Sequence, residues 1–390
     1  MPGSRRVIFN PMPLTHLGDM PIEVFLRDYW QQKPLLIRAA LPDFKSPLTG
    51  DDLAGLALEE EVESRLVLEQ GRLPWELRNG PFIEEDFARL PDSHWTLLVQ
   101  AVNQWTPEVN DLLRAFRFLP DWRLDDIMVS YAADRGSVGP HFDYYDVFLL
   151  QGAGCRHWQL GQNCDSTSPL RRDTELNLLS DFEPAEDWLL EPGDMLYLPP
   201  GLAHWGRAEG DDCITYSIGF RAPSPAELLP ELSQEVASHL DNDQRYRDPG
   251  LKPVHSPGAI TPEVVEQLRQ LILEQITPEH LAQWFGQHMT QPKYPELSPE
   301  TQPSDTRADQ LERHPGTRFA YYALNDHQAW LFVNGVSHEC SLALAELLCQ
   351  DFCFAKSQLQ AFNPPQDQAL IDELIHQCTL LPLTLPREKP

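Results

Sequence analysis

The sequence predicts a mainly β domain of the barrel or double-stranded β-helix class with flanking helices, followed by a helical bundle and a small α+β unit. Residues 126–221 consist of short β-rich segments separated by Gly, Pro and Asp turns, with no helix of useful length between them. From residue 224 onward the apolar residues recur at helical spacing. A proline-rich stretch then precedes a hairpin signal and two more helical segments. These changes predict the order of the domains.

The first domain is expected to span residues 1–223 and to open with helical elements. A helix is predicted over 23–30 and a short strand over 35–37, because a Lys-Pro break separates them. Residues 51–120 are interpreted as further helices that pack against a larger body. The apolar face of one of these helices is expected to carry Trp95, Leu97, Leu98, Ala101 and Val102.

The predicted antiparallel sheet follows these helices. Its strands are the segments IMVSYA, DVFLLQ, RHWQL, DWLLE, DMLYLP and CITYSIGF, in chain order. Gly152-Ala153-Gly154 stands between the second and third segments, so a hairpin is expected there. Closely spaced strands without crossover helices favour a barrel over a parallel α/β sheet.

A helical domain is predicted over residues 224–290. Ser224 and Glu227 have the spacing of a capping box, and a proline occupies the first helical position between them. Two later Thr-Pro-Glu segments open further helices, the second of which is expected to end near Gly286. Three short amphipathic helices in succession indicate a small bundle.

The remaining chain is expected to comprise a Pro-rich linker over 291–306 and a winged-helix-like domain over 307–390. The linker holds four prolines among polar residues, which is too little apolar surface for a core. An Asn-Gly pair directly after the apolar segment WLFV is a strong hairpin signal. Helices are predicted over 341–349 and 366–378.

The composition limits the classes of protein to which the chain can belong. No run approaches the roughly 18 apolar residues of a membrane-spanning helix, and no secretory signal is recognised near the N-terminus. The seven cysteines are scattered without a CxxC pair and are interpreted as reduced thiols, so the cytoplasm is the expected compartment. A net charge of −29 repels bare nucleic acid and attracts a basic protein, although many acidic proteins use such charge only for solubility.

One motif in the β-rich region has the spacing of a metal site. His141 and Asp143 flank Phe142, so in an extended backbone both polar side chains point to the same face. A Pro-Gly-Asp turn, an apolar strand and a Pro-Pro-Gly turn then precede His204. Two imidazoles and one carboxylate on one side of a metal leave open positions, as non-haem Fe(II) chemistry requires. We therefore predict a metal site of these three residues; the alternative is a barrel that keeps the histidines for packing.

Two further residues are candidates for binding a 2-oxo dicarboxylate at that metal. Arg156 follows the predicted hairpin, so a returning strand would bring it beside the metal, where a guanidinium clamps a carboxylate with two hydrogen bonds. Ser130, on the strand that enters the site, is expected to add a hydroxyl donor. The alternative for Arg156 is a position on the surface.

With these residues the chain resembles a known family, the bacterial JmjC-type ribosomal oxygenases. The resemblance covers most of the chain, and from about residue 291 onward it rests on architecture rather than on motifs. The segments that carry it are FLRDYWQQKPLLIR at 25–38, ESRLV at 63–67, WTLLVQAVNQW at 95–105, LPDWRLDDIMVSY at 119–131, GPHFDYYDVFLLQGAGCRHW at 139–158, LEPGDMLYLPPGLAHWG at 190–206 and YSIGFRAPSPAEL at 216–228.

The resemblance implies a JmjC/cupin jelly-roll enzyme that uses Fe(II), 2-oxoglutarate and O2. It implies that His141, Asp143 and His204 hold the iron and that Arg156 and Ser130 contact 2-oxoglutarate. It further implies hydroxylation of an arginine in ribosomal protein sixteen of the large subunit, and a helical dimerisation domain that makes the protein a homodimer. A winged-helix-like domain is expected to follow the dimerisation domain.

Substrate choice is open at this stage, because a metal site alone does not select the target. A cationic target suits a rim of aromatic and acidic side chains, for which Tyr131, Tyr144, Tyr145 and Asp146 are candidates, although such residues often serve packing or surface roles. Hydroxylation or demethylation of another residue, such as His or Lys, is an alternative. A non-enzymatic, ligand-sensing regulator is another. Few, scattered basic residues after position 303 argue against direct nucleic-acid binding.

Overall fold

The described residues form two compact units, and the chain passes from one to the other between Ala222 and Pro223. Most of the predicted Pro-rich linker, from residue 296 to residue 306, lies outside the described part of the chain. The computed structural model describes residues 13–42, 44–71, 74–241, 243–253, 255–295 and 309–383.

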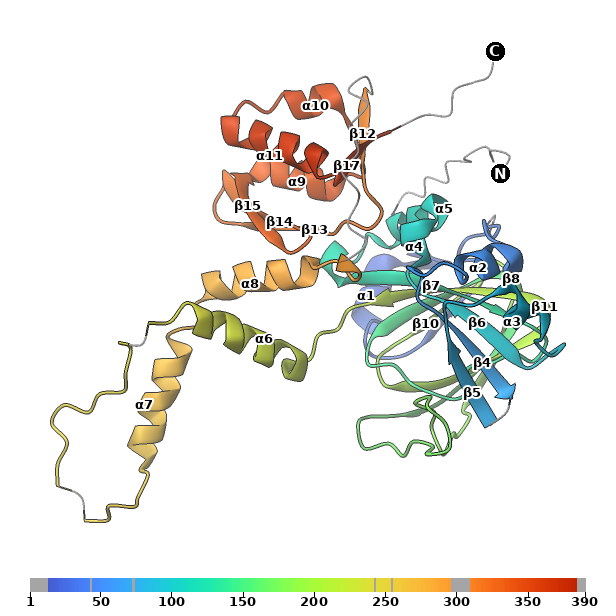
Figure 1. The fold of residues 1–390 in the computed structure, drawn as a ribbon, viewed down its shortest axis with the longest axis horizontal. Coiled ribbons are helices and arrows are strands. Elements are labelled where there is room, and N and C mark those ends of the chain that lie inside the picture. Colours follow the sequence, from blue (N-terminus) through green and yellow to red (C-terminus); the bar gives the residue numbers. More distant parts are fainter. Residues whose placement is uncertain are drawn as a thin grey trace. The chain divides into compact units, whose positions relative to one another are not determined.

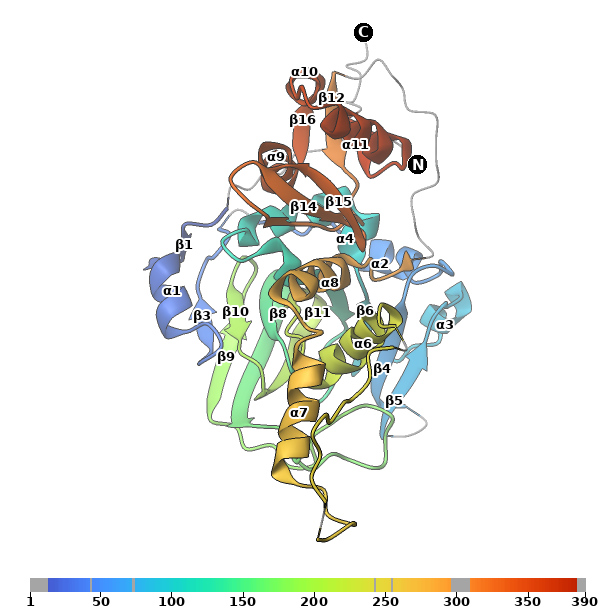
Figure 2. The same cartoon turned by 90° about the vertical axis from the view of Figure 1, so that its left-hand side faces the viewer.

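The first unit is built on one antiparallel sheet, as the sequence predicts, and this sheet has nine strands. Its order is β3-β10-β8-β11-β7-β6-β4-β5, with β9 beside β8, and Figure 2 shows these strands side by side. The strands of this unit are β1 (His16–Leu17), β2 (Met20–Pro21), β3 (Leu35–Ile37), β4 (Ser64–Gln70), β5 (Pro74–Asn79), β6 (Trp95–Val99), β7 (Leu124–Ala132), β8 (Asp146–Asn163), β9 (Glu186–Leu190), β10 (Met195–Leu198) and β11 (Leu202–Phe220).

Strands β8 and β11 are much longer than the segments predicted for them. The hairpin expected at Gly152-Ala153-Gly154 is wrong, because β8 continues through these residues and stays paired with β11 on both sides of them. The extra residues lie instead in β11, where the register jumps between Glu209 and Ile214. Gly154 has a φ of +58°, and a Cβ there would lie 2.9 Å from the Asp212 carbonyl oxygen. Only a glycine fits this conformation and this close contact, and here it bends β8 rather than ending it in a hairpin. The first half of β8 then pairs with β10 and the second half with β9.

Short helices cover one face of this sheet, as Figure 1 shows. The largest apolar cluster lies between them and joins Leu53 of α2 and Val102 of α4 to Leu97 of β6 and Val129 of β7. The opposite face carries the alternate side chains of the same strands. The helices are α1 (Ile22–Asp28), α2 (Gly50–Leu56), α3 (Glu84–Ala88), α4 (Val102–Trp105) and α5 (Pro107–Asp111), with 3₁₀ turns at Leu112–Phe116 and Asp121–Arg123.

The purely helical interpretation of residues 51–120 is wrong, since β4, β5 and β6 lie within this range. The apolar run at 95–99 is a strand between β4 and β7, and four of its five residues are buried. A strand covered on both faces reads as an unbroken apolar run, which periodicity alone does not distinguish from a buried helix.

The second unit begins with three helices and ends in a small α+β fold. The capping box of Ser224 and Glu227 is present, and α8 continues to Thr290, beyond the predicted end near Gly286. The Asn334-Gly335 turn joins β14 to β15, with φ values of +49° and +85°. The elements are α6 (Pro225–Ser238), α7 (Pro262–Leu273), α8 (Pro278–Thr290), β12 (Gln310–Arg313), β13 (Phe319–Ala323), β14 (Gln328–Val333), β15 (Val336–Ser341), α9 (Leu342–Gln350), β16 (Cys353–Ala355), α10 (Lys356–Gln360), α11 (Pro365–His376) and β17 (Leu380–Pro382).

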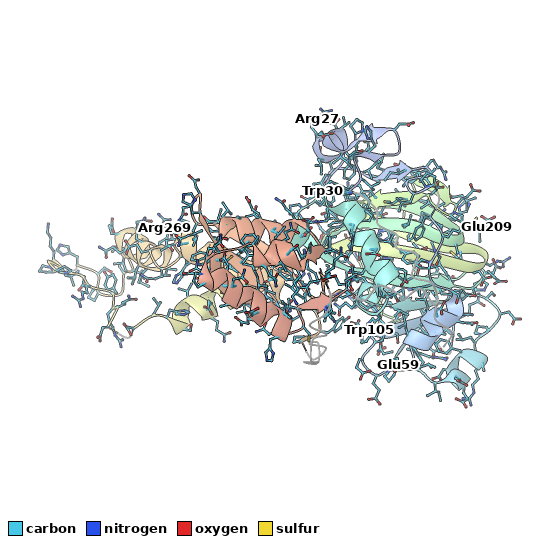
Figure 3. The ribbon with its side chains drawn as sticks, turned by 90° about the horizontal axis from the view of Figure 1, so that it is seen from above. Arg27, Trp30, Glu59, Trp105, Glu209 and Arg269 are labelled. Atoms are coloured by element: carbon cyan, nitrogen blue, oxygen red, sulfur yellow. The ribbon has the colours of Figure 1, made fainter. Side chains whose placement is uncertain are left out.

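The surface of α7 differs from that of the other helices in this unit. None of the residues of α7 is buried, and Arg269, labelled in Figure 3, pairs with Glu266 of the same helix at 2.8 Å.

Among the described residues, no helix has both the length and the apolar character that a membrane span requires.

Candidate metal centre

The two predicted histidine ligands are neighbours in the fold. His141 precedes β8 and His204 lies at the start of β11, and their backbones form an antiparallel bridge. The His141 amide donates to the His204 carbonyl at 3.1 Å, and the His204 amide donates to the His141 carbonyl at 2.8 Å. This pair of hydrogen bonds brings the two imidazole ring centroids to 4.3 Å from each other.

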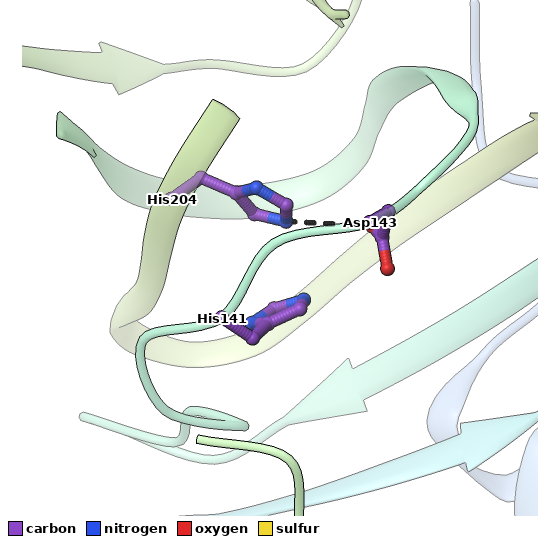
Figure 4. A group of neighbouring side chains, drawn as sticks. All are labelled: His141, Asp143 and His204. Atoms are coloured by element: carbon purple, nitrogen blue, oxygen red, sulfur yellow. Dashed lines mark ion pairs between the residues drawn. The ribbon is translucent and has the colours of Figure 1, made fainter. Parts of the chain in front are cut away.

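Both imidazoles present the same nitrogen to a common point. The Nδ1 atoms of His141 and His204 lie 2.9 Å from the carbonyl oxygens of Gly139 and Leu202. A carbonyl only accepts, so each Nδ1 carries the proton and each Nε2 keeps a free lone pair, which is the tautomer that binds a metal. Figure 4 shows both rings and the Asp143 carboxylate converging. One ligand atom from each of the three residues lies within 4.8 Å of the other two.

Asp143 is fixed by the turn that precedes β11. The Gly201 amide donates to the Asp143 carbonyl at 2.7 Å, and Gly201 has a φ of +78°, where an L side chain would be strained. The Asp143 Oδ2 atom lies 3.7 Å from the His204 Nε2 atom, the pair joined by the dashed line in Figure 4. The Pro-Pro-Gly turn noted in the sequence therefore positions two of the predicted ligands. The amide of Gly201 holds the backbone of Asp143, and His204 follows this turn in the chain.

Burial sets the charge state of the site. His204 is 3% exposed, and burial, followed by the repulsion of His141, lowers the pKa of its imidazole to about 4. The ring is therefore neutral near pH 7, and no proton has to leave before it binds a cation. Tyr145 stands beside this site: although its ring is 44% exposed, desolvation of its hydroxyl and then the carboxylates of Asp143 and Asp126 raise its pKa.

Arg156 lies inside the first unit and not on its surface. It is 3% exposed, its Nε donates to the Cys213 sulfur at 3.4 Å, and its Nη2 has no hydrogen-bond partner among the described residues. The ring of Trp158 lies 5.7 Å from the Arg156 Cζ atom and 5.9 Å from the His204 ring. An unpaired, buried guanidinium nitrogen near His204 is suited to binding an anionic ligand. Arg156 reaches this place along the continuous strand β8, and not by the returning strand that the sequence predicts.

Ser130 belongs to a polar strip on the same sheet. It is 4% exposed, and its hydroxyl makes one long contact, 3.5 Å to the Thr215 carbonyl. The side chain of Thr215 donates to Gln151, which in turn donates to the Cys213 sulfur that Arg156 also contacts. The strip therefore connects the two predicted co-substrate residues across β7, β11 and β8.

The residues beside Arg156 have small side chains. Ala208, its cross-strand neighbour on β11, forms one buried cluster with Ala132 and Cys213. The Thr96 hydroxyl, on the strand next to Ala132, has no hydrogen-bond partner among the described residues. The predictions missed Thr96 and Trp158, because no sequence signal distinguishes an unpaired buried donor from a packed one.

Two of the four residues expected at the rim lie elsewhere. Asp146 is fully buried and accepts hydrogen bonds from Tyr197, Gln31 and Arg123. Tyr131 faces the helices on the other side of the sheet, because it alternates with the inward Ser130 along β7. Tyr144 and Tyr145 remain exposed near Asp143.

Comparison with known proteins places this site in a family. A JmjC-domain model matches residues 111–228, and a ROXA-like winged-helix model matches residues 267–380. The ribosomal protein uL16 3-hydroxylase of Escherichia coli K12 is 41% identical over 277 residues, which are 69% of this chain and 71% of the relative. This chain belongs to the JmjC ribosomal oxygenase family. A probable ribosomal oxygenase of Haemophilus influenzae is 40% identical over 260 residues, 65% of this chain and 64% of that protein.

Solved ribosomal oxygenase structures share the fold along almost the whole chain. The crystal structure of E. coli YcfD superposes with a TM-score of 0.83 and 32% identity, covering 94% of this chain and 100% of that one. A YcfD structure in complex with cobalt and 2-oxoglutarate has a TM-score of 0.79. These matches confirm the predicted family and the predicted fold class, a β-rich JmjC domain with flanking helices followed by a winged-helix domain.

Proposed function

We propose that this ribosomal oxygenase is an Fe(II)- and 2-oxoglutarate-dependent hydroxylase of a ribosomal protein. The observation that carries the proposal is the convergence of two imidazole nitrogens and one carboxylate oxygen within 4.8 Å, next to a buried guanidinium. The E. coli relative is named a hydroxylase of ribosomal protein uL16, and YcfD is described in complex with cobalt and 2-oxoglutarate. Cobalt stands there for a divalent metal such as Fe(II).

His141, Asp143 and His204 would hold the metal. A two-histidine, one-carboxylate set is typical of Fe(II) oxygenases, and the neutral Nε2 atoms and the free carboxylate oxygen fit such an ion. When bound together with 2-oxoglutarate and O2, the iron supplies the oxidising power that inserts one oxygen atom into a C–H bond of the target. The carbonyls of Gly139 and Leu202 hold both rings in the metal-binding tautomer, so the chain itself provides the orientation.

Arg156 would bind the distal carboxylate of 2-oxoglutarate. Its buried position, its unpaired Nη2 and the small side chains beside it suit a carboxylate that enters from the metal side. Ser130 would add a hydroxyl donor from the polar strip, since its present contact at 3.5 Å is at the limit of a hydrogen bond. Arg156 and Ser130 would thus hold one end of the co-substrate, and the metal that His141, Asp143 and His204 would bind would hold the other.

The target is an arginine side chain of ribosomal protein uL16 in this proposal. Tyr144 and Tyr145 are exposed near Asp143, and aromatic faces of this kind attract a guanidinium. The chain's net charge of −29 favours a basic protein partner such as a ribosomal protein. Such a substrate would place the enzyme in the cytoplasm.

Two alternatives make different predictions. A histidine or lysine target would use the same metal site and differ only in the residue that gains oxygen. A DNA-binding regulator would need a basic C-terminal domain, but residues 309–383 carry nine Asp or Glu against three Lys or Arg. One of the three, Arg313, is itself buried. The charge pattern supports the enzyme without direct nucleic-acid binding.

A homodimer formed through residues 224–290 is part of the proposal. Val265, Leu268 and Ile272 lie on one face of α7 and are 55%, 40% and 62% exposed. An exposed apolar face of this kind marks an interaction surface. We retain 1–223 as the oxygenase domain, 224–290 as the dimerisation domain, 291–306 as the linker and 307–390 as the winged-helix-like domain.

The decisive experiment incubates uL16 with the enzyme, Fe(II), 2-oxoglutarate and air. The expected result is a mass increase of one oxygen atom, located on an arginine by fragmentation, together with succinate. Asp143→Ala should abolish both products, whereas Asp173→Ala, at a carboxylate that pairs with Arg171 on the surface, should leave them unchanged. Oxygen on a different residue type would overturn the arginine assignment alone, and an absence of both products with the wild type would overturn the enzyme.

A further inference from the structure

Trp158 carries a buried hydrogen-bond donor that nothing in the described chain satisfies. Its side chain lies on β8 and is 5% exposed, and its indole Nε1 has no partner among the described residues. Buried N–H groups in folded proteins are almost always paired, because losing hydration without a new hydrogen bond is costly. This donor therefore points to a water molecule or a ligand.

The position of Trp158 relates it to the co-substrate site. It follows Arg156 by two residues on the same strand, so both side chains lie on one face of the sheet. Its ring lies 5.7 Å from the Arg156 Cζ atom and 5.9 Å from the centroid of the His204 ring. Trp158 thus stands between the residue proposed to bind the distal carboxylate and a proposed metal ligand.

Gly206 fixes the orientation of the indole. A Cβ at Gly206 would lie 2.7 Å from the Cη2 and Cζ3 atoms of Trp158, so the six-membered ring rests directly on the β11 backbone. The three nearest ring atoms, Cη2, Cζ3 and Cε3, lie at 2.7–2.9 Å from that Cβ, so the ring presents its face to β11 and its N–H runs along the sheet rather than toward β11. A side chain at position 206 would displace the ring, so the position of the Trp158 indole depends on the glycine at 206.

We propose that Trp158 binds 2-oxoglutarate, donating its Nε1–H to the distal carboxylate that Arg156 also holds. A carboxylate has about four lone-pair sites, so it accepts from both donors without competition. The inference rests on the proposed function, because it assumes that 2-oxoglutarate occupies this face. In this arrangement Arg156 supplies the positive charge, and the neutral N–H of Trp158 fixes the orientation of the carboxylate.

Calorimetric titration of 2-oxoglutarate into the full-length, Mn(II)-loaded protein tests this role. Trp158→Phe removes the N–H and keeps an aromatic ring, and it is expected to weaken 2-oxoglutarate binding about tenfold. Mn(II) binding, followed separately by electron paramagnetic resonance, should not change. The control Trp188→Phe, at the neighbouring position on β9, should bind 2-oxoglutarate like the wild type.

The outcomes separate this inference from the function on which it rests. Wild-type protein that binds Mn(II) but no 2-oxoglutarate would overturn the proposed function. If the wild type binds and Trp158→Phe binds within about twofold of it, a trapped water satisfies the indole, and only the inference fails. Should Trp158→Phe not fold, ¹⁵N-tryptophan labelling of the Zn(II)-loaded wild type replaces it. One indole N–H signal is then expected to move downfield when 2-oxoglutarate is added, and no movement of any signal would overturn the role.

Discussion

Replacing Arg156 by methionine separates co-substrate binding from stability. The guanidinium is 3% exposed, contacts the Cys213 sulfur at 3.4 Å and has an unpaired Nη2 among the described residues. Such a group has lost its hydration without gaining equivalent hydrogen bonds, so it destabilises the protein when no anion is bound. Methionine has a similar length, fills the space with apolar atoms and removes this cost.

The structure sets the size of both effects. The Cys213 contact and the cation–π contact with Trp158 are worth about 1 kcal/mol each or less, which the relieved desolvation offsets. The melting temperature without co-substrate should therefore stay equal or rise by up to about 4 °C. Two charge-assisted hydrogen bonds to a carboxylate are worth about 3–4 kcal/mol together, so the Kd for 2-oxoglutarate should rise about 150- to 1,000-fold. Arg156→Lys keeps the charge and one bond, and should lose about 10- to 30-fold.

Differential scanning calorimetry of the metal-free chain and calorimetric titration of the Mn(II)-loaded chain measure these two quantities. In Arg156→Met the melting temperature should hold or rise while the affinity for 2-oxoglutarate falls. A variant that melts more than about 8 °C below the wild type would mean that Arg156 is a structural ion. Unchanged affinity for 2-oxoglutarate would refute its role as the carboxylate clamp.

Three further perturbations test other parts of the account. Burial lowers the pKa of His204 to about 4, below the 6.5 of the unfolded chain, so the metal-free protein should lose stability as the pH falls from about 6.5 to about 4. A His204→Gln variant should show a smaller loss in melting temperature over that window. Ile272→Asp should convert a dimer to a monomer in light scattering, because it charges the exposed apolar face of α7, while Gln270→Asp should leave the dimer intact. Asp146→Ala should destabilise the first unit by about 3 kcal/mol in thermal melts, because it leaves Arg123 without its buried carboxylate; an unchanged melting temperature would show that this pair contributes nothing.

The convergence of His141, Asp143 and His204 was predictable because it depends on local chain geometry. His141 and Asp143 are separated by one residue in extended backbone, and the turn before His204 is defined by Pro and Gly. The helix starts of the second unit and the Asn334-Gly335 hairpin were predictable for the same reason, since capping and turn chemistry act over three or four residues.

Features that depend on tertiary pairing were not predictable. The strand at 95–99 has the apolar content of a buried helix, and only its pairing with β4 and β7 decides its structure. The Gly-rich segment at 152–154 has turn composition, yet the continuous pairing with β11 makes it a bend in one long strand. Asp146 appears as a surface residue in the sequence, and its burial follows from three donors that are distant along the chain.

His141, Asp143 and His204 are proposed to hold one divalent metal together. Electron paramagnetic resonance of Mn(II) titrated into the wild type and into the three single alanine variants measures this directly. One tightly bound ion is expected per wild-type chain, and every variant is expected to lose it. Wild-type affinity for Mn(II) in Asp143→Ala or in either histidine variant would contradict this proposal.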